Sequence, residues 1–413
     1  MKFSVLLPTR NRLELLQQAI ETVRRQDYED WEIIVSDNAS EQDIQGYISS
    51  LKDSRVKYFR TSQFVSVTEN WNIALNLSCG EYVIMLGDDD CLMKNYFSSA
   101  NSIIENFSSP DFIFSEAFLY GYPKVMPEFP NGFLKTFGNC NLWKDHDKPF
   151  LISKCDREAL LRDTYNFKVV FAYNMQFATM RRSFIESLKI NGLFFHSSYP
   201  DYYAMTLMML KGETVVGCPY PLVTVGISPK SFGFYFFNKR EKEGVKFLNH
   251  ASSDAPDDFL KKIILPGLDM NTCWLLSLYA IKKNFDTACK FPINCSRYRY
   301  LQILYHLKLL IHAPSSLKDI RKGFFHFLSN REKILYLPLF FSIAAVFSAL
   351  KFLPKRINSK FVYLLEKSVN KIARSHPRHP YEFISGFYPN ILSVFENVNL
   401  SFSSKNKTNV PHK

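Results

Sequence analysis

The stretch Gly80–Leu92, GEYVIMLGDDDCL, decides how the rest of this sequence is interpreted. Its first part, Tyr82–Leu86, is a short apolar run with β-branched and aromatic members, which is typical of a buried strand. A glycine follows, and then come three consecutive carboxylates, Asp88, Asp89 and Asp90. Carboxylates this close repel one another, and a divalent cation such as Mg²⁺ or Mn²⁺, shared with substrate phosphates, would neutralise them. The alternative is a solvated acidic turn that caps the next helix.

Strands and helices alternate in the residues before this stretch. Short apolar runs predict strands at Phe3–Leu7, Trp31–Val35 and Val56–Phe59, ahead of the one at Tyr82–Leu86. Between them, apolar residues recur at helical spacing, with predicted helices over residues 13–23, 44–51 and 68–77. This alternation predicts an α/β fold with right-handed crossovers and a mainly parallel sheet.

Polar residues follow three of these strands directly, as Pro8-Thr9-Arg10, Asp37-Asn38 and Asp88-Asp89-Asp90. Ligands of such sheets bind outside the carboxyl ends of the strands, so we expect the three clusters to meet in one crevice. The sequence contains no GxGxxG and no GxxxxGK[ST] motif, which argues against a dinucleotide fingerprint and a P-loop. A metal on the aspartates is therefore the expected means of holding a nucleotide or phosphate.

The residues after the triplet continue the pattern less regularly. We expect a helix over residues 96–107, a short strand at 112–114, a long ordered loop at 121–150 and a strand within 171–180. A further helix begins at Asp201 and bears three methionines, which we interpret as core packing, and a strand follows at Val215–Val216.

Four segments together resemble the family 2 glycosyltransferases of the GT-A fold, of the type that builds bacterial cell-surface polysaccharides. They are SVLLPTRNR near the N-terminus, EIIVSDNAS at 32–40, NWNIALNLSCGEYVIMLGDDDCL at 70–92 and PDYYA around Asp201. The resemblance covers about the first 225 residues. It implies a nucleotide-sugar donor, UDP-linked, a divalent cation (Mn²⁺ or Mg²⁺) and inversion at the anomeric carbon. The QxxRW signature of processive members is absent, which favours a single addition.

The resemblance also implies roles for individual residues. Pro8, Thr9 and Arg10 would line the base and ribose pocket, and Asp37 would bind the edge of the base. In this family the usual order of the acidic motif is Asp-x-Asp-Asp, and Gly87 stands here at the first aspartate. Asp88 and Asp89 would then contact the ribose or the metal, and either Asp89 or Asp90 would be the direct metal ligand.

Asp201 resembles the catalytic base of the family, with Pro200 in place of the usual preceding Glu. An acceptor hydroxyl is a poor nucleophile until a carboxylate takes its proton, and we expect Asp201 to be that carboxylate. The alternative is an N-cap for the helix that follows. We thus predict a metal-dependent inverting glycosyltransferase acting on a glycan or lipid-linked acceptor. The competing hypotheses are a non-catalytic nucleotide-sugar-binding scaffold and a nucleotidyltransferase, whose Gly-rich phosphate loop is not evident.

Charge divides the 413-residue chain unevenly. From Lys290 onward it has 20 Lys and Arg against 5 Asp and Glu, which leaves a net charge of −3 for the first 289 residues out of +12 overall. The eight cysteines show no CxxC pair or zinc spacing, and the N-terminus lacks a secretory pattern, so we expect a cytoplasmic protein.

The basic part also contains an uncharged run, Ile334–Leu350, that is flanked by Lys and Arg and interrupted by Pro338. It is at the short limit of a membrane span and suits a helix lying in the interface on anionic lipid; the alternative is a core helix. No nucleic-acid-binding motif supports a nucleic-acid partner. We expect a catalytic domain at 1–228, a helical, basic and membrane-associating region at 229–400 on the inner face of the cell membrane, and a disordered tail at 401–413.

Overall fold

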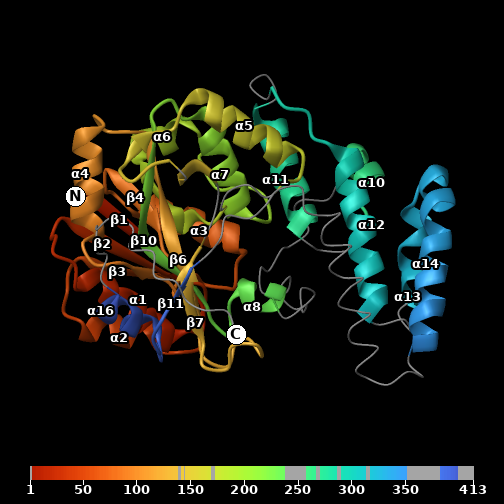
Figure 1. Cartoon of the computed structure of the whole chain (residues 1–413). Helices are drawn as coiled ribbons and strands as arrows, with labels where there is room; N and C mark the ends of the chain where they lie inside the picture. Colours follow the sequence, from red (N-terminus) through yellow and green to blue (C-terminus); the bar gives the residue numbers. More distant parts are fainter. Residues whose placement is uncertain are drawn as a thin grey trace.

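One large mixed sheet, covered by helices, organises this protein (Figure 1). The structure is a computed structural model, and it describes residues 2–137, 141–143, 145–168, 173–237, 257–266, 270–285, 290–312, 317–350 and 382–398. The predicted tail at 401–413 lies outside the described residues. Along the sheet the strand order is β11-β7-β6-β9-β4-β1-β2-β3. Outside this order, β10 pairs with β6, β5 and β8.

The strands are β1 (Phe3–Thr9), β2 (Trp31–Asp37), β3 (Val56–Arg60), β4 (Tyr82–Met85), β5 (Cys91–Leu92), β6 (Phe112–Gly121), β7 (Phe133–Thr136), β8 (Phe150–Leu151), β9 (Ala178–Arg181), β10 (Val215–Ile227) and β11 (Phe383–Ile384). The helices of the sheet region are α1 (Leu13–Arg24), α2 (Ile44–Ser50), α3 (Val67–Leu77), α4 (Tyr96–Asn106), α5 (Lys154–Tyr165), α6 (Arg182–Ser187), α7 (Pro200–Lys211) and α16 (Ile391–Asn397). The remaining helices are α8 (Phe232–Phe237), α10 (Asp258–Ile263), α11 (Met270–Phe285), α12 (Cys295–His312), α13 (Leu317–Gly323) and α14 (Asn330–Leu350), with short 3₁₀ turns at Asn141–Trp143, Met175–Phe177 and Phe325–Phe327.

The four N-terminal strands form the parallel half of the sheet in the order β4-β1-β2-β3. β1, β2 and β4 are buried almost completely, because helices cover both faces of this half. The predicted strands and the α/β class are confirmed. β1 and β2 each run two residues further than expected, so that Thr9 and Asp37 are still part of the sheet.

The other half of the sheet is mixed. β9 lies antiparallel between β4 and β6, whereas the 13-residue strand β10 runs parallel to β6. The prediction of a loop over 121–150 was wrong in part, because β7 forms a hairpin with the far end of β6 and β8 pairs with β10. Of the strand expected within 171–180, residues 171–172 lie outside the described part, and β9 begins at Ala178.

A helical region extends from the sheet through α11 to α12, α13 and α14, with α14 at its outer edge (Figure 1). α11 packs on α7, and α14 packs on α12. Helix α14 includes the predicted uncharged run and contains Pro338. Among the helices that the structure describes, none combines the length and the apolarity that crossing a membrane requires.

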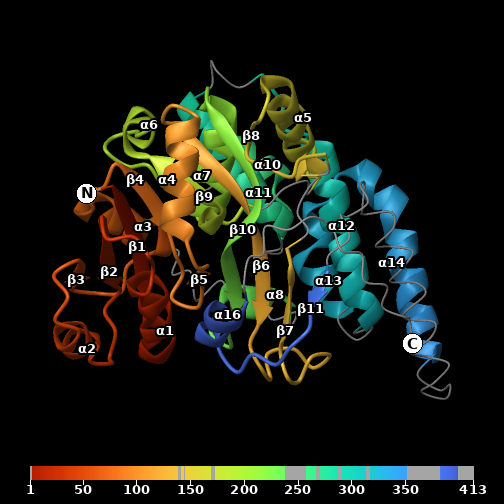
Figure 2. The same ribbon diagram turned by 60° about the vertical axis from the view of Figure 1, so that its left-hand side comes forward.

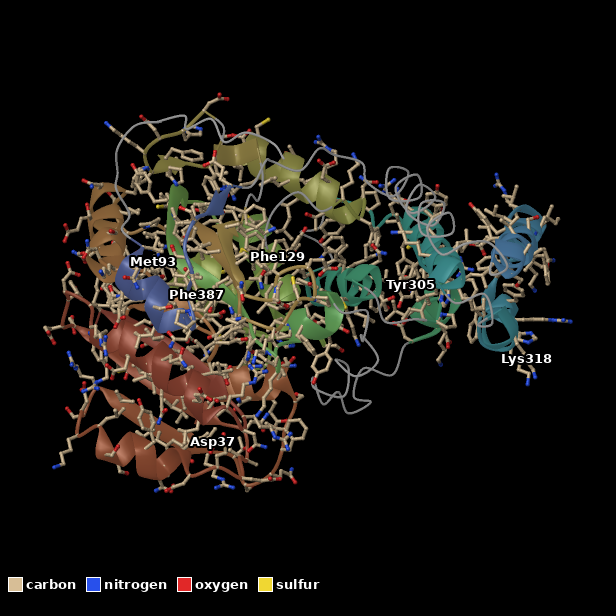
Figure 3. The ribbon with its side chains drawn as sticks, turned by 60° about the horizontal axis from the view of Figure 1, so that its bottom comes forward. Asp37, Met93, Phe129, Tyr305, Lys318 and Phe387 are labelled. Atoms are coloured by element: carbon tan, nitrogen blue, oxygen red, sulfur yellow. The ribbon has the colours of Figure 1, made fainter. Side chains whose placement is uncertain are left out.

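Residues 382–398, which we call the C-terminal strap, return to the sheet. β11 pairs antiparallel with β7, and the hydroxyl of Tyr120 donates a hydrogen bond of 2.6 Å to the carbonyl oxygen of Tyr388. Helix α16 then lies beside α1 and near Met93 (Figures 2 and 3). Its residues Ile391, Val394 and Phe395 are buried. The strap therefore belongs to the packing of the sheet and not to that of the helical region.

Candidate active site

A cavity of about 700 Å³ opens at the carboxyl ends of the parallel strands. Its wall brings together the turn after β1, the turn after β4, the first turn of α7 and the segment after β10. The lining residues include Pro8–Arg12, Asn38, Phe64, Asn70, Trp71, Gly87–Asp90, Gln176, Asp201, Tyr202 and Lys230. The crevice expected from the strand ends is therefore present, and all but one of the predicted site residues line it.

The exception is Asp37, whose side chain is completely buried behind the wall (labelled in Figure 3). Its carboxylate accepts hydrogen bonds from the hydroxyl of Tyr58 (2.8 Å) and the backbone N–H of Ser40 (2.9 Å). The next residue, Asn38, lines the cavity instead. This placement gives Asp37 a role in fixing the turn after β2, and its predicted contact with a base edge stays a prediction.

Arg10 lies on the same side of the cavity, where its guanidinium stacks on the ring of Phe64, 3.3 Å from the centroid. Pro8 and Thr9 line the wall beside it. A guanidinium held flat on an aromatic ring offers a further planar surface to a nucleobase. The three residues expected to line the base and ribose pocket therefore lie together in the cavity.

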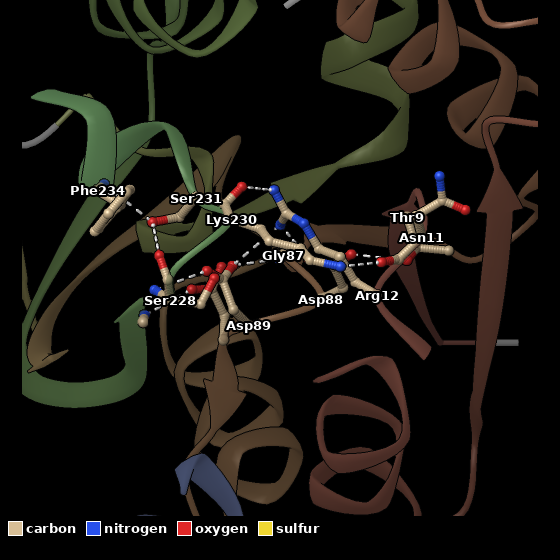
Figure 4. Close-up of polar contacts among 12 residues, drawn as sticks. Thr9, Asn11, Arg12, Gly87, Asp88, Asp89, Ser228, Lys230, Ser231 and Phe234 are labelled. Carbon is tan, nitrogen blue, oxygen red and sulfur yellow. Dashed lines mark hydrogen bonds and ion pairs between the residues drawn. The ribbon is translucent and has the colours of Figure 1, made fainter. Parts of the chain in front are cut away.

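Residues 87–90, which we call the carboxylate turn, line the cavity, and Figure 4 shows polar contacts of this turn. Asp88 accepts hydrogen bonds from the hydroxyl of Thr9 (2.7 Å) and from the guanidinium of Arg12 (2.6 Å). Burial raises the pKa of Asp88, and the Arg12 charge opposes that rise. For Arg12, burial disfavours the charged form, but Asp88 and Asp89 outweigh it and raise the pKa of the guanidinium.

Asp90 lines the cavity and is bound by three protein donors. Its carboxylate accepts hydrogen bonds from the backbone N–H groups of Gly87 (2.9 Å) and Gly226 (2.8 Å) and from the side-chain amide of Gln176 (2.7 Å). Burial, with a further contribution from Asp89, raises the pKa of Asp90 to about 8. These three hydrogen bonds argue for a structural role, so a role of Asp90 as the metal ligand stays a prediction with weak support.

The glycine at position 87 has a physical reason. A Cβ atom there would lie 2.4 Å from the Oδ2 atom of Asp90, a distance that side chains do not tolerate. Without that atom, the Asp90 carboxylate folds back onto the Gly87 N–H. The departure from the usual Asp-x-Asp-Asp order therefore goes together with the hydrogen bond between the Gly87 N–H and the last aspartate.

Of the three aspartates, Asp89 accepts the fewest hydrogen bonds from the described residues. One oxygen accepts a weak hydrogen bond of 3.3 Å from the backbone N–H of Ser228, and the other lies 3.9 Å from a guanidinium nitrogen of Arg12. The hydroxyl of Ser228 is buried and makes no hydrogen bond among the described residues. Across the described ranges, no three His, Cys, Asp or Glu side chains surround a common point. The residues thus fit a hard cation held by one or two carboxylates and substrate phosphates, and not one enclosed by protein ligands alone.

Asp201 reaches the cavity from the first turn of α7, where Pro200 begins the helix. Its carboxylate accepts a hydrogen bond of 2.9 Å from the backbone N–H of Tyr202. Burial raises the pKa of Asp201 to about 7, although that hydrogen bond acts in the opposite direction. A carboxyl group with this pKa exchanges a proton near neutral pH, which is what a general base requires.

Sequence reasoning did not select several residues that build this site. Arg12, two positions after Arg10 in the same turn, pairs with the carboxylate turn, and Lys230 donates a hydrogen bond to the carbonyl oxygen of Asn11 beside it. Gln176 and Ser228 contact the turn from distant parts of the chain. Only Arg12 had a local signal, since it follows the strand end within the polar cluster.

Residues 4–150 match the profile of the family described as Glycosyl transferase family 2. The N-terminal region of this chain is therefore similar to that family. A curated relative from Campylobacter jejuni, GalNAc(5)-diNAcBac-PP-undecaprenol beta-1,3-glucosyltransferase, is 28% identical over 199 residues, which are 47% of this chain and 56% of the relative. The putative colanic acid biosynthesis glycosyl transferase WcaA of Escherichia coli is 30% identical over 134 residues, which are 31% of this chain and 48% of WcaA. The chain thus spans about half the length of these two relatives.

Among solved structures, S. aureus TarS in complex with UDP aligns with 69% of this chain and 81% of its own. Its sequence identity to this chain is 14% and its TM-score is 0.44.

Proposed function

We propose that this protein is an inverting glycosyltransferase that moves a sugar from a UDP-linked donor to a hydroxyl group of a glycan or lipid-linked acceptor. One observation carries the proposal. The carboxylate turn after β4 and Asp201 at the start of α7, more than a hundred residues apart, line the same cavity, and Asp201 has a pKa of about 7. The cavity also holds the cations Arg12 and Lys230, which suit a diphosphate.

In the reaction, an acceptor oxygen forms a bond to the anomeric carbon while the bond from that carbon to the diphosphate breaks. Asp201 takes the proton of the acceptor hydroxyl, a contribution of roughly 10²–10⁴-fold. Pro8, Thr9, Arg10 and Asn38 hold the nucleoside. A divalent cation on Asp89, when bound, supplies Lewis-acid stabilisation of the leaving diphosphate.

The acceptor class is proposed from two sources. The Campylobacter relative is named for an acceptor built on PP-undecaprenol. In this chain, helix α14 has an exposed apolar face, with Ile334 76% and Leu335 57% exposed, continued by Leu339, Phe341 and Val346. Apolar surface of this extent is unusual on a protein that meets only water.

Exposed basic side chains lie on the neighbouring helix α13 and at the start of α14. They are Lys318, Arg321, Lys322 and Arg331, and Lys318 points away from the body of the protein (Figure 3). We propose that the face of α14 and these cations dock on the anionic inner face of the cell membrane. The catalytic cavity would then lie close to a lipid-linked acceptor.

Donor specificity is tested by measuring the thermal stability of the protein with a panel of nucleotide sugars, with and without Mn²⁺. We expect a metal-dependent shift with UDP-sugars. Transfer should be lost in Asp201→Asn while donor binding remains, and Asp156→Asn, in the first turn of α5 outside the cavity, should leave both intact. Retained transfer in Asp201→Asn would refute the assigned base. Donor binding without transfer in the wild type would favour the scaffold alternative.

Membrane docking is tested by flotation with vesicles that contain anionic lipid. The double change Ile334→Ser and Leu335→Ser should weaken vesicle binding by about tenfold or more, because each removes well-exposed apolar area from the interface. Leu77→Ser, at an exposed leucine of α3, is the matched control and should not change it. Equal flotation of both proteins would refute this surface.

A further inference from the structure

Arg12 pairs with the carboxylate turn from the turn after β1. It is the residue before α1, and its side chain is only 8% exposed. One guanidinium nitrogen lies 2.6 Å from an oxygen of Asp88 and 3.9 Å from an oxygen of Asp89. The other donates a hydrogen bond to the carbonyl oxygen of Lys230 (Figure 4). A buried cation with these contacts is held by its carboxylates, since a buried charge without them would be unstable.

The same two carboxylates are those that a divalent cation would use. Asp88 and Asp89 together carry two negative charges, and Arg12 is within 4 Å of both. A divalent cation on Asp89 would therefore stand close to the guanidinium, where like charges repel strongly in a poorly hydrated site. Metal and Arg12 cannot both keep their best contacts with Asp88 and Asp89.

The diphosphate of a donor would meet Arg12 in the same cavity, because the residues of the carboxylate turn and Arg12 line one wall. A guanidinium binds phosphate oxygens through two parallel N–H groups, as it does carboxylates. The diphosphate thus offers Arg12 a replacement for the carboxylates that a metal would take over.

We propose that Arg12 is an exchangeable counter-cation: it neutralises Asp88 and Asp89 in the empty site and moves to the donor diphosphate when a divalent cation binds Asp89. This inference rests on the proposed function, since it assumes a nucleoside diphosphate ligand. Its consequence is that metal and nucleotide favour each other's binding. A bound metal releases Arg12 from the carboxylates for the diphosphate, and a bound diphosphate draws Arg12 away from the carboxylates that hold the metal.

The competing role is a structural one. Lys230 donates from its ammonium group to the carbonyl oxygen of Asn11 (2.8 Å), and Ser228 binds Asp89, so the segment after β10 is already attached to the turn after β1. Arg12 could serve only as a further attachment between these segments. In that case its loss would loosen the site and lower the affinities for metal and nucleotide together. Loss of an exchangeable counter-cation would instead raise the affinity for metal and lower that for nucleotide.

The experiment measures two affinities in the full chain, for Mn²⁺ alone by electron paramagnetic resonance and for UDP at saturating Mn²⁺ by calorimetry. Arg12→Met keeps the apolar stem and removes the charge. We expect it to bind Mn²⁺ about tenfold more tightly and UDP about tenfold more weakly than the wild type. A fall in both affinities, or an unchanged Mn²⁺ affinity, would overturn the proposal.

Unpaired carboxylates could prevent Arg12→Met from folding, and a double variant covers that case. Arg12→Met with Asp88→Asn restores the charge balance; we expect Mn²⁺ affinity near that of the wild type and UDP still bound about tenfold more weakly. Unchanged UDP binding there would refute the proposal. Arg24→Met, at the far end of α1, is the control and should alter neither affinity. A wild type that binds no nucleotide at all would instead refute the proposed function.

Discussion

Replacing Asp201 by Asn should make the enzyme inactive and more stable at the same time. Burial raises the pKa of Asp201 from 3.8 to about 7 in the folded protein. The folded state therefore binds this proton more tightly than the unfolded state does. The wild type pays a free-energy cost for the ionised carboxylate above pH 7, and below about pH 4 the cost vanishes because both states are protonated.

The magnitude follows from the shift. About three pKa units at 1.36 kcal/mol each give an upper limit of about 4 kcal/mol, and partial exposure of Asp201 reduces this to about 2 kcal/mol. Asn keeps an oxygen for the N–H of Tyr202 and carries no charge, so it should recover that amount at pH 8 and about half of it or less at pH 5. Transfer activity should fall by roughly 10²–10⁴-fold, and wild-type activity should rise with pH towards 7 as Asp201 ionises.

Two measurements check this prediction. Urea unfolding at both pH values, followed by tryptophan fluorescence, gives the stability difference. Product formation from UDP-sugar at saturating acceptor gives the activity. Equal stability of the two proteins at pH 8, or a gain that grows towards pH 5, would refute the electrostatic reasoning even if activity is lost. Asp156→Asn should show neither the gain nor the loss.

Two further predictions concern the carboxylate turn and the C-terminal strap. Asp89→Asn should weaken Mn²⁺ binding in calorimetry with little change in stability, whereas Asp90→Ala should lower the free energy of unfolding by about 1–3 kcal/mol, because three buried donors lose their acceptor. Loss of Mn²⁺ binding in Asp90→Ala but not in Asp89→Asn would make Asp90 the metal ligand. Ile391→Ala, fully buried in α16, should cost about 2–4 kcal/mol of stability in urea unfolding, and a cost near zero would mean that the strap does not hold the sheet.

The sequence predicted the parallel half of the sheet because its strands are short apolar runs that end in polar residues. The same feature placed Thr9, Arg10 and Asp88 in one cavity, since strands that run parallel bring their ends to one edge. It did not reveal whether Asp37 or Asn38 faces the ligand. Both residues are buried, and the hydrogen bonds from Tyr58 and Ser40 hold the Asp37 carboxylate away from the cavity that Asn38 lines.

Contacts between distant residues explain what the sequence did not predict. Asp90 is fixed by Gln176 and Gly226, which lie 86 and 136 residues further along the chain. No local pattern contains that information. Likewise, β7 lies in a segment rich in Pro, Gly and aromatic residues, and it becomes a strand because β6 and β11 flank it.

The pairing of β11 with β7 also has a consequence for the synthesis of the protein. Lys135 on β7 pairs with Phe383 on β11, so β7 stays without this partner until residues about 250 positions later are translated. At 5–20 residues per second, the interval on the ribosome is on the order of ten to fifty seconds. During that time the outer edge of β7 has unpaired backbone groups, a feature that invites association with other chains. Nascent and prematurely terminated chains should therefore need protection by chaperones that the full-length chain no longer needs.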